Sequence, residues 1–62
     1  MTDDERAALR AWVDDKGVDA VAQSIGVSDD TIRRWCATTT PHGLALRALR
    51  RQLARRAKES AR

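Results

Sequence analysis

The chain has little of the chemistry that usually stabilises or equips so short a protein. Its 62 residues include one cysteine, Cys36, so no internal disulfide can form. One cysteine and one histidine, His42, are too few ligands for a zinc site. No set of residues suggests catalysis, and no glycine-rich loop suggests a phosphate cradle. The sequence therefore predicts a protein that is not an enzyme and uses no metal or other cofactor, and it shows no site for a small-molecule ligand.

Long hydrophobic segments are also missing. No apolar run approaches the roughly 20 residues that span a bilayer. Residues 1–5 are acidic and lack the apolar segment of a secretory signal. Together with the free thiol, these features predict a cytoplasmic protein with no membrane partner.

Large apolar residues are few, which limits the core that the chain can build alone. A chain this short buries only roughly 60% of the surface that it exposes when unfolded. Small domains usually add a disulfide, a metal or a partner chain, and the first two are excluded here. We therefore expect a homodimer.

Positive charge is concentrated at the C-terminal end of the chain. The formal net charge is +3. Residues 44–62 hold seven basic residues against one acidic residue, a net charge of +6, whereas residues 1–17 and 18–43 carry −2 and −1. A basic segment on a neutral-to-acidic body suggests a polyanionic partner.

Ala22, Gly26 and Ile32 have the spacing that a helix-turn-helix needs. Ala22 is small, so a second helix can cross close to it. Gly26 lies where the first helix must end sharply, and only glycine adopts a positive φ there without strain. Ile32 points back from the second helix into the corner between the two. The spacing predicts a helix-turn-helix at about residues 18–37.

Apolar periodicity and capping residues predict a single all-α, four-helix domain over residues 1–62. Thr2 and Glu5 form a capping-box pattern before the first helix. Ser28 is a good N-cap for the third helix. The four helices are expected at residues 3–16, 18–25, 28–37 and 42–58.

The fourth helix is expected to be long and basic, with Thr40 as its cap and Pro41 in its first position. Its leucines form one apolar stripe, the first half of which is expected to close the core over the first and third helices. The later part of the stripe extends beyond so small a body. It therefore supplies the candidate contacts between two copies of the chain, which are Leu49, Leu53 and Ala57.

This pattern resembles the small bacterial and phage helix-turn-helix regulators of the lambda-repressor/Cro-like superfamily. The resemblance covers about residues 17–53 and depends on Ala22, Gly26-Val27-Ser28, Thr31-Ile32 and Trp35. It implies a sequence-specific regulator of transcription that binds double-stranded DNA, most often as a dimeric repressor. The helix at residues 28–37 would then read the major groove.

By this resemblance, one set of residues faces the bases and a second set faces the phosphates. Arg33 is the best candidate for a bidentate contact to guanine, and Arg34 can make the same contact or hold a phosphate. The expected groove-facing residues are Ser28, Asp29, Asp30, Arg33, Arg34 and Ala37. The expected phosphate contacts are Thr38, Thr39, Arg47 and Arg51, for which a plain loop and a solvated basic face are the simpler alternatives.

The two aspartates admit two interpretations. Asp29 and Asp30 each precede an arginine by four residues, so they suit exposed ion pairs along the helix, worth about 0.3–0.5 kcal/mol each. Alternatively, a carboxylate orients Arg33 or accepts a hydrogen bond from cytosine.

The chain departs from this family at three points. Val18 stands where many members have a glutamine that contacts phosphate, and Asp29-Asp30 stand where the reading helix usually begins with Gln, Ser, Thr or Arg. Many members also have five helices, whereas this chain has room for four. The first two departures favour an alternative function, a protein-binding adaptor of the antirepressor or antitoxin kind that reuses the fold.

Overall fold

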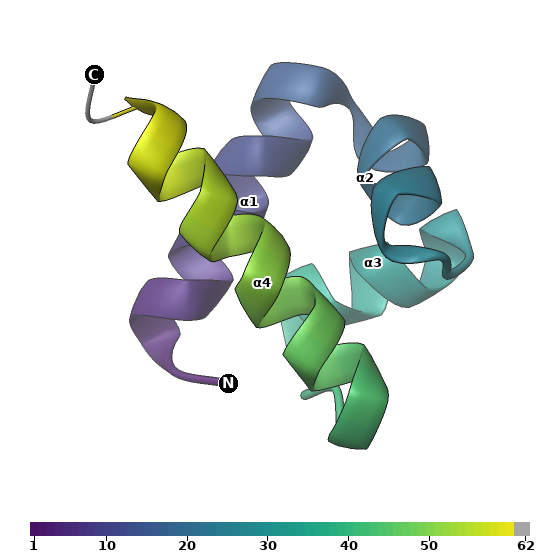
Figure 1. Cartoon of the computed structure of the whole chain (residues 1–62). Helices are drawn as coiled ribbons and strands as arrows, with labels where there is room; N and C mark the ends of the chain where they lie inside the picture. The colour runs from purple at the N-terminus through teal and green to yellow at the C-terminus, as the bar shows by residue number, and fades with distance from the viewer. Residues whose placement is uncertain (61–62) are drawn as a thin grey trace.

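Four α-helices follow one another with short connections in the computed structural model, which describes residues 1–60 (Figure 1). They are α1 (Asp3–Lys16), α2 (Val18–Ile25), α3 (Asp29–Ala37) and α4 (Gly43–Ser60). The protein is therefore an all-α, four-helix domain, as the sequence predicts. The bounds of α1, α2 and α3 agree with the expected ones to within one residue.

The ends of α1 are set by the residues that the sequence singles out. The backbone N–H of Glu5 donates to Thr2 Oγ1 at 3.1 Å, and the backbone N–H of Thr2 donates to Glu5 Oε1 at 2.8 Å. This reciprocal pair is a capping box. At the other end, Gly17 has a φ of 91° and its N–H donates to the Val13 carbonyl. The change of direction between α1 and α2 thus depends on a backbone conformation that favours glycine.

α4 begins within one residue of the expected start, but the residues expected to cap it have other roles. Thr40 does not cap this helix and Pro41 is not in its first turn, because α4 begins at Gly43. Instead, Thr40 Oγ1 accepts a hydrogen bond from Arg6 Nη2 at 3.4 Å, and Pro41 is buried. The connection between α3 and α4 is thus held against α1, and the helix starts beyond it.

The core combines residues from all four helices. α4 packs against α1 and α2, and in residues 1–60 it makes no close backbone contact with α3. The side chains of α4 nevertheless close the core as expected, because Leu49 belongs to one buried cluster with residues of α1 and with Ile32 and Trp35 of α3. The buried apolar side chains are Leu9, Trp12, Val21, Ala22, Ile32, Trp35 and Leu49.

Leu49 corrects the expected dimer contact. Its side chain is 0% exposed and belongs to the core, so it is not available to a second copy of the chain. Leu53 is half-buried against the same core, and Ala57 is exposed. The large apolar residue that α4 does expose is Leu44, at 80%. It lies five residues before Leu49, on another side of the helix.

Two arginines of α4 bind α1 and fix how the helices cross. Arg50 Nε donates to Glu5 Oε2 at 2.8 Å. Near the other end of α1, Arg56 Nη1 lies 3.6 Å from Asp15 Oδ2, and its guanidinium lies 5.6 Å from the centre of the Trp12 ring. Because the earlier α1 residue pairs with the earlier α4 residue and the later with the later, the two helices run in the same general direction, as Figure 1 shows.

The pair between Glu5 and Arg50 predicts a loss of stability in acid. The hydrogen bond from Arg50, with that from the Thr2 backbone, lowers the pKa of Glu5 from 4.5 to about 2. A lowered folded-state pKa stabilises the fold above the unfolded-state pKa. This contribution is therefore full above pH 4.5 and is lost as the pH falls toward 2. We expect the urea midpoint of unfolding to fall across this window and to fall less in Glu5→Gln, which keeps a capping-box side chain without the charge.

The matched control for this measurement is Asp4→Asn, which removes a first-turn carboxylate that forms no ion pair in the described part of the chain. In this variant the urea midpoint of unfolding should fall between pH 4.5 and 2 as steeply as it does in the parent protein. If the urea midpoint of Glu5→Gln fell with pH as steeply as that of the parent protein, the role given to the Glu5–Arg50 pair would be contradicted.

Residues 1–60 contain neither a candidate membrane-spanning helix nor a candidate metal site. None of the four helices there has both the length and the hydropathy that a membrane crossing requires. Among the same residues, no three His, Cys, Asp or Glu side chains gather in a way that would hold a metal ion. Cys36 is half-buried, and burial raises the pKa of its thiol, which keeps it in the less reactive protonated form.

Candidate nucleic-acid interface

The turn between α2 and α3 has the geometry that the sequence predicts. Gly26 has a φ of 90° and a ψ of 33°, the left-handed conformation. Its N–H and that of Val27 both donate to the Ala22 carbonyl, at 2.8 and 3.0 Å. Ala22 and Ile32 are buried between the two helices. Residues 18–37 thus form a helix-turn-helix in which α3 crosses α2 closely.

Gly26→Ala should destabilise the protein by about 1–2 kcal/mol, because a Cβ in the left-handed region clashes with the following carbonyl. The cause is the local backbone alone, since beyond Gly26 and its two chain neighbours no atom lies within 4 Å of the position that the Cβ would take. Gly26→Asn should cost less, because asparagine tolerates this conformation better. Chemical denaturation measures both. Equal losses for alanine and asparagine would contradict this explanation.

The N-terminus of α3 is capped by Ser28. Its Oγ accepts from the Thr31 N–H at 3.2 Å and lies 2.8 Å from Thr31 Oγ1. Ile32 and Trp35 point into the core and fix the rotation of α3 about its axis. The opposite side of this helix therefore faces outward, and its exposed residues include Arg33, Arg34 and Ala37.

The aspartates of α3 pair with its arginines. Arg34 Nη2 lies 3.1 Å from Asp30 Oδ2, and Arg33 Nη2 lies 3.9 Å from Asp29 Oδ2. The arginine side chains are 70% and 67% exposed. The structure thus has the ion pairs that one interpretation of Asp29 and Asp30 predicts, and both guanidinium groups are at the surface.

The C-terminus of α3 is held by two arginines of α1 that the sequence analysis missed. Arg10 Nε donates to the Cys36 carbonyl at 2.7 Å, and Arg6 Nη1 donates to the Ala37 carbonyl at 2.9 Å. Cations stabilise the last carbonyls of a helix, where the macrodipole is negative. Arg6 and Arg10 lie one turn apart on α1, and this spacing is the only sequence signal for the contact. These two arginines fix where α3 projects from the body.

Thr38 and Thr39 follow α3 and are both exposed. Their backbone N–H groups donate to the Arg34 carbonyl, each at 3.0 Å. Only their hydroxyl groups are therefore available to a phosphate. They lie beside Ala37 at the end of the outward face of α3.

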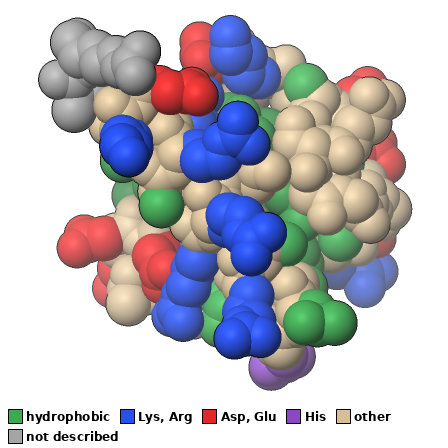
Figure 2. Space-filling view, viewed as in Figure 1, with side chains coloured by type: hydrophobic (Ala, Val, Ile, Leu, Met, Phe, Trp, Pro, Cys, Tyr) green, Lys and Arg blue, Asp and Glu red, His purple; other side chains and the backbone are tan. Residues whose placement is uncertain are grey.

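Arg47 and Arg51 are exposed as expected, but they lie on a different part of the surface from α3. Both come from α4, which has no close backbone contact with α3 in the described residues. In Figure 1, α4 crosses the front of the molecule and α3 lies behind it. Figure 2 shows a column of Lys and Arg side chains along α4 on this front face.

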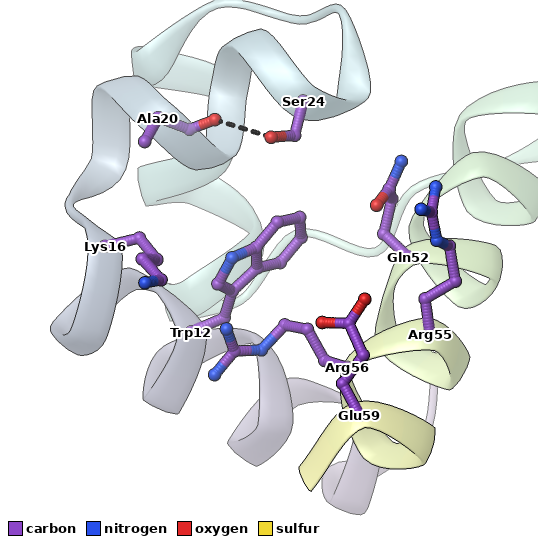
Figure 3. A pocket seen from close by; sticks show the side chains of 8 residues that line it. All are labelled: Trp12, Lys16, Ala20, Ser24, Gln52, Arg55, Arg56 and Glu59. Atoms are coloured by element: carbon purple, nitrogen blue, oxygen red, sulfur yellow. Dashed lines mark hydrogen bonds between the residues drawn. The ribbon is translucent and has the colours of Figure 1, made fainter.

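A shallow groove of about 340 Å³ separates α4 from α1 and α2 (Figure 3). Its floor is Trp12, and Arg56 folds over the ring at 5.6 Å. Arg55, the next residue along α4, extends away from the ring toward the outside. Neighbouring arginines of one helix thus have different surroundings, since Arg56 binds α1 and Arg55 faces solvent.

Comparison with known proteins identifies no relative of the chain. No protein-family model matches the chain, and no curated protein and no solved structure shows significant similarity to it. Any proposal of function therefore depends on the surfaces of α3 and α4.

Proposed function

We propose that the protein binds double-stranded DNA and reads the major groove with α3. The observation that supports this most is the outward face of α3. Arg33 and Arg34 present exposed guanidinium groups from a helix whose inward residues are locked in the core. An α-helix fits the major groove, and arginine is the commonest reader of guanine there.

The energies of the competing contacts favour this interpretation. An exposed ion pair such as Asp30–Arg34 contributes about 0.3–0.5 kcal/mol. A bidentate contact from arginine to guanine discriminates by about 1–3 kcal/mol. DNA can therefore draw the arginines away from Asp29 and Asp30, which then accept hydrogen bonds from cytosine or water.

The proposal includes the regulatory role that the resemblance to lambda-repressor/Cro-like proteins implies. The protein would act in the cytoplasm as a bacterial or phage repressor. Two base-reading arginines give one copy little specificity, so we propose that two copies bind one palindromic site, with their α3 helices about 34–36 Å apart. The expected contact between the copies is now reduced to Leu53 and Ala57, and sedimentation of the free protein tests it.

Selection from a pool of random duplexes tests the proposed function. The expected result is one enriched, palindromic sequence that binds at least 1,000-fold (about 10³) more tightly than an unrelated duplex at physiological salt. Enrichment of no sequence would contradict the proposal. A fall in affinity with rising salt would accompany binding in either case, so the test depends on the ratio between sequences.

A protein-binding adaptor is the second candidate, because acidic side chains lie where a phosphate would approach. A hollow of about 310 Å³ separates the first turn of α2 from the N-terminus of α3. Helix N-termini favour anions, but here Asp19 and Asp29 line the hollow. Failure of every duplex to bind would favour the adaptor.

A further inference from the structure

Four basic side chains form a stripe along the outer side of α4, which we name the α4 stripe. Its members are Arg47, Arg51, Arg55 and Lys58, all exposed. Successive arginines are one helical turn apart, and the four span about 16 Å along the axis at 1.5 Å per residue. In the part of the chain that the structure describes, none of the four forms an ion pair.

The fold separates this stripe from the other basic residues of α4. Arg50 is bound to Glu5 and Arg56 to Asp15 and the Trp12 ring. The stripe therefore consists of those cations of α4 that have no structural partner. Its only acidic neighbour on α4 is Glu59, which lines the groove beside Trp12.

The α4 stripe and the reading face of α3 belong to helices that lie on separate parts of the fold. α3 and α4 each pack against α1 and α2 but make no close backbone contact with each other. α4 lies at the front of the molecule and α3 at the back (Figure 1). We therefore expect a duplex on α3 to leave the α4 stripe uncovered.

We infer that the α4 stripe binds the phosphate backbone of a second DNA segment, so that one protein joins two duplexes. This inference extends the proposed function and depends on duplex DNA being the partner. A row of evenly spaced, unpaired cations is complementary to a phosphate backbone and carries no means of reading sequence. The second segment is therefore bound whatever its sequence.

Two other anionic partners fit the stripe less well. A membrane-bound amphipathic helix needs a free apolar face, and the apolar face of α4 is used in the core through Leu49 and Leu53. Protein interfaces are enriched in anchoring aromatic residues, but both tryptophans of the chain, Trp12 and Trp35, are buried. DNA needs neither feature.

A bridging assay tests the inference. The full-length protein is bound to an immobilised duplex carrying the selected sequence, and a labelled duplex of unrelated sequence is then added. The wild type should capture the labelled duplex, and this capture should weaken steeply with salt. Arg51→Gln/Arg55→Gln should stay bound to the immobilised duplex but capture much less of the labelled one. The salt slope of the capture that remains should fall by about 2, since each phosphate contact contributes roughly 0.9.

The matched control is Arg33→Gln/Arg34→Gln, which also removes two exposed positive charges. It should lose its preference for the selected duplex while keeping salt-dependent binding to unrelated DNA.

If the stripe variant captures the labelled duplex as well as the wild type does, the inference is overturned and the proposed function stands. If the wild type shows no sequence preference but the stripe variant alone loses binding to DNA, the stripe is supported and reading by α3 is contradicted. Binding of the wild type to vesicles rich in phosphatidylserine, without capture of DNA, would overturn the inference as well.

Discussion

Leu49→Ala should leave the protein largely unfolded at room temperature. The Leu49 side chain is fully buried where α4 meets α1 and α2. A buried leucine replaced by alanine costs about 2–5 kcal/mol, through lost burial and the cavity that remains. A domain this short rarely has more than about 3–5 kcal/mol of stability to lose. Circular dichroism and urea denaturation measure the loss.

Leu44→Ala is the matched control, since it makes the same chemical change on the same helix. Leu44 is 80% exposed, so its replacement should change the stability by less than about 0.5 kcal/mol. A stable, folded Leu49→Ala variant would contradict the placement of α4. If it were also monomeric while the wild type is dimeric, Leu49 would be the dimer contact that the sequence analysis expected.

Arg33→Ala should weaken binding to the selected duplex by roughly 5- to 150-fold, which corresponds to about 1–3 kcal/mol for one bidentate contact to guanine. The variant should lose its base preference at one position in each half of the site. Substituting that guanine should cost the wild type as much as the mutation does and should cost the variant little. Titration of both proteins against both duplexes gives the four affinities.

Arg51→Ala provides the comparison for this experiment. Because Arg51 lies on α4, away from α3, its replacement should weaken only the sequence-independent part of DNA binding and leave the base preference at the selected site unchanged. The assignment of Arg33 as the reader fails if its replacement lowers affinity equally for all sequences, or if Arg51→Ala changes the preferred base.

Local signals in the sequence were sufficient to predict most of the backbone. The capping box of Thr2 and Glu5, the cap at Ser28 and the left-handed turn at Gly26 each act over three or four residues, and the structure confirms all three. The expected cap of α4 was wrong because the local signal at Thr40 and Pro41 competes with a distant residue. Arg6 binds the connection before α4, and local patterns contain no information about that contact.

Contacts between helices were harder to predict for the same reason. Periodicity places Leu49 on the apolar side of α4, but it does not say whether this side meets the body or a second copy of the chain. The hydrogen bonds from Arg6 and Arg10 to the end of α3 join residues that are 31 and 26 positions apart in the sequence. The exposure of Arg33 and Arg34 was predictable because Ile32 and Trp35 fix the inner side of a short helix.

The most direct test of the central claim is to map the amide signals of the labelled protein as the selected duplex is added. Reading by α3 predicts the largest chemical-shift changes at residues 28–39, and it predicts that a duplex of unrelated sequence leaves the signals of Arg33 and Arg34 largely unchanged. Changes confined to α1 and α2, or the same changes in α3 with both duplexes, would contradict the claim that α3 reads DNA.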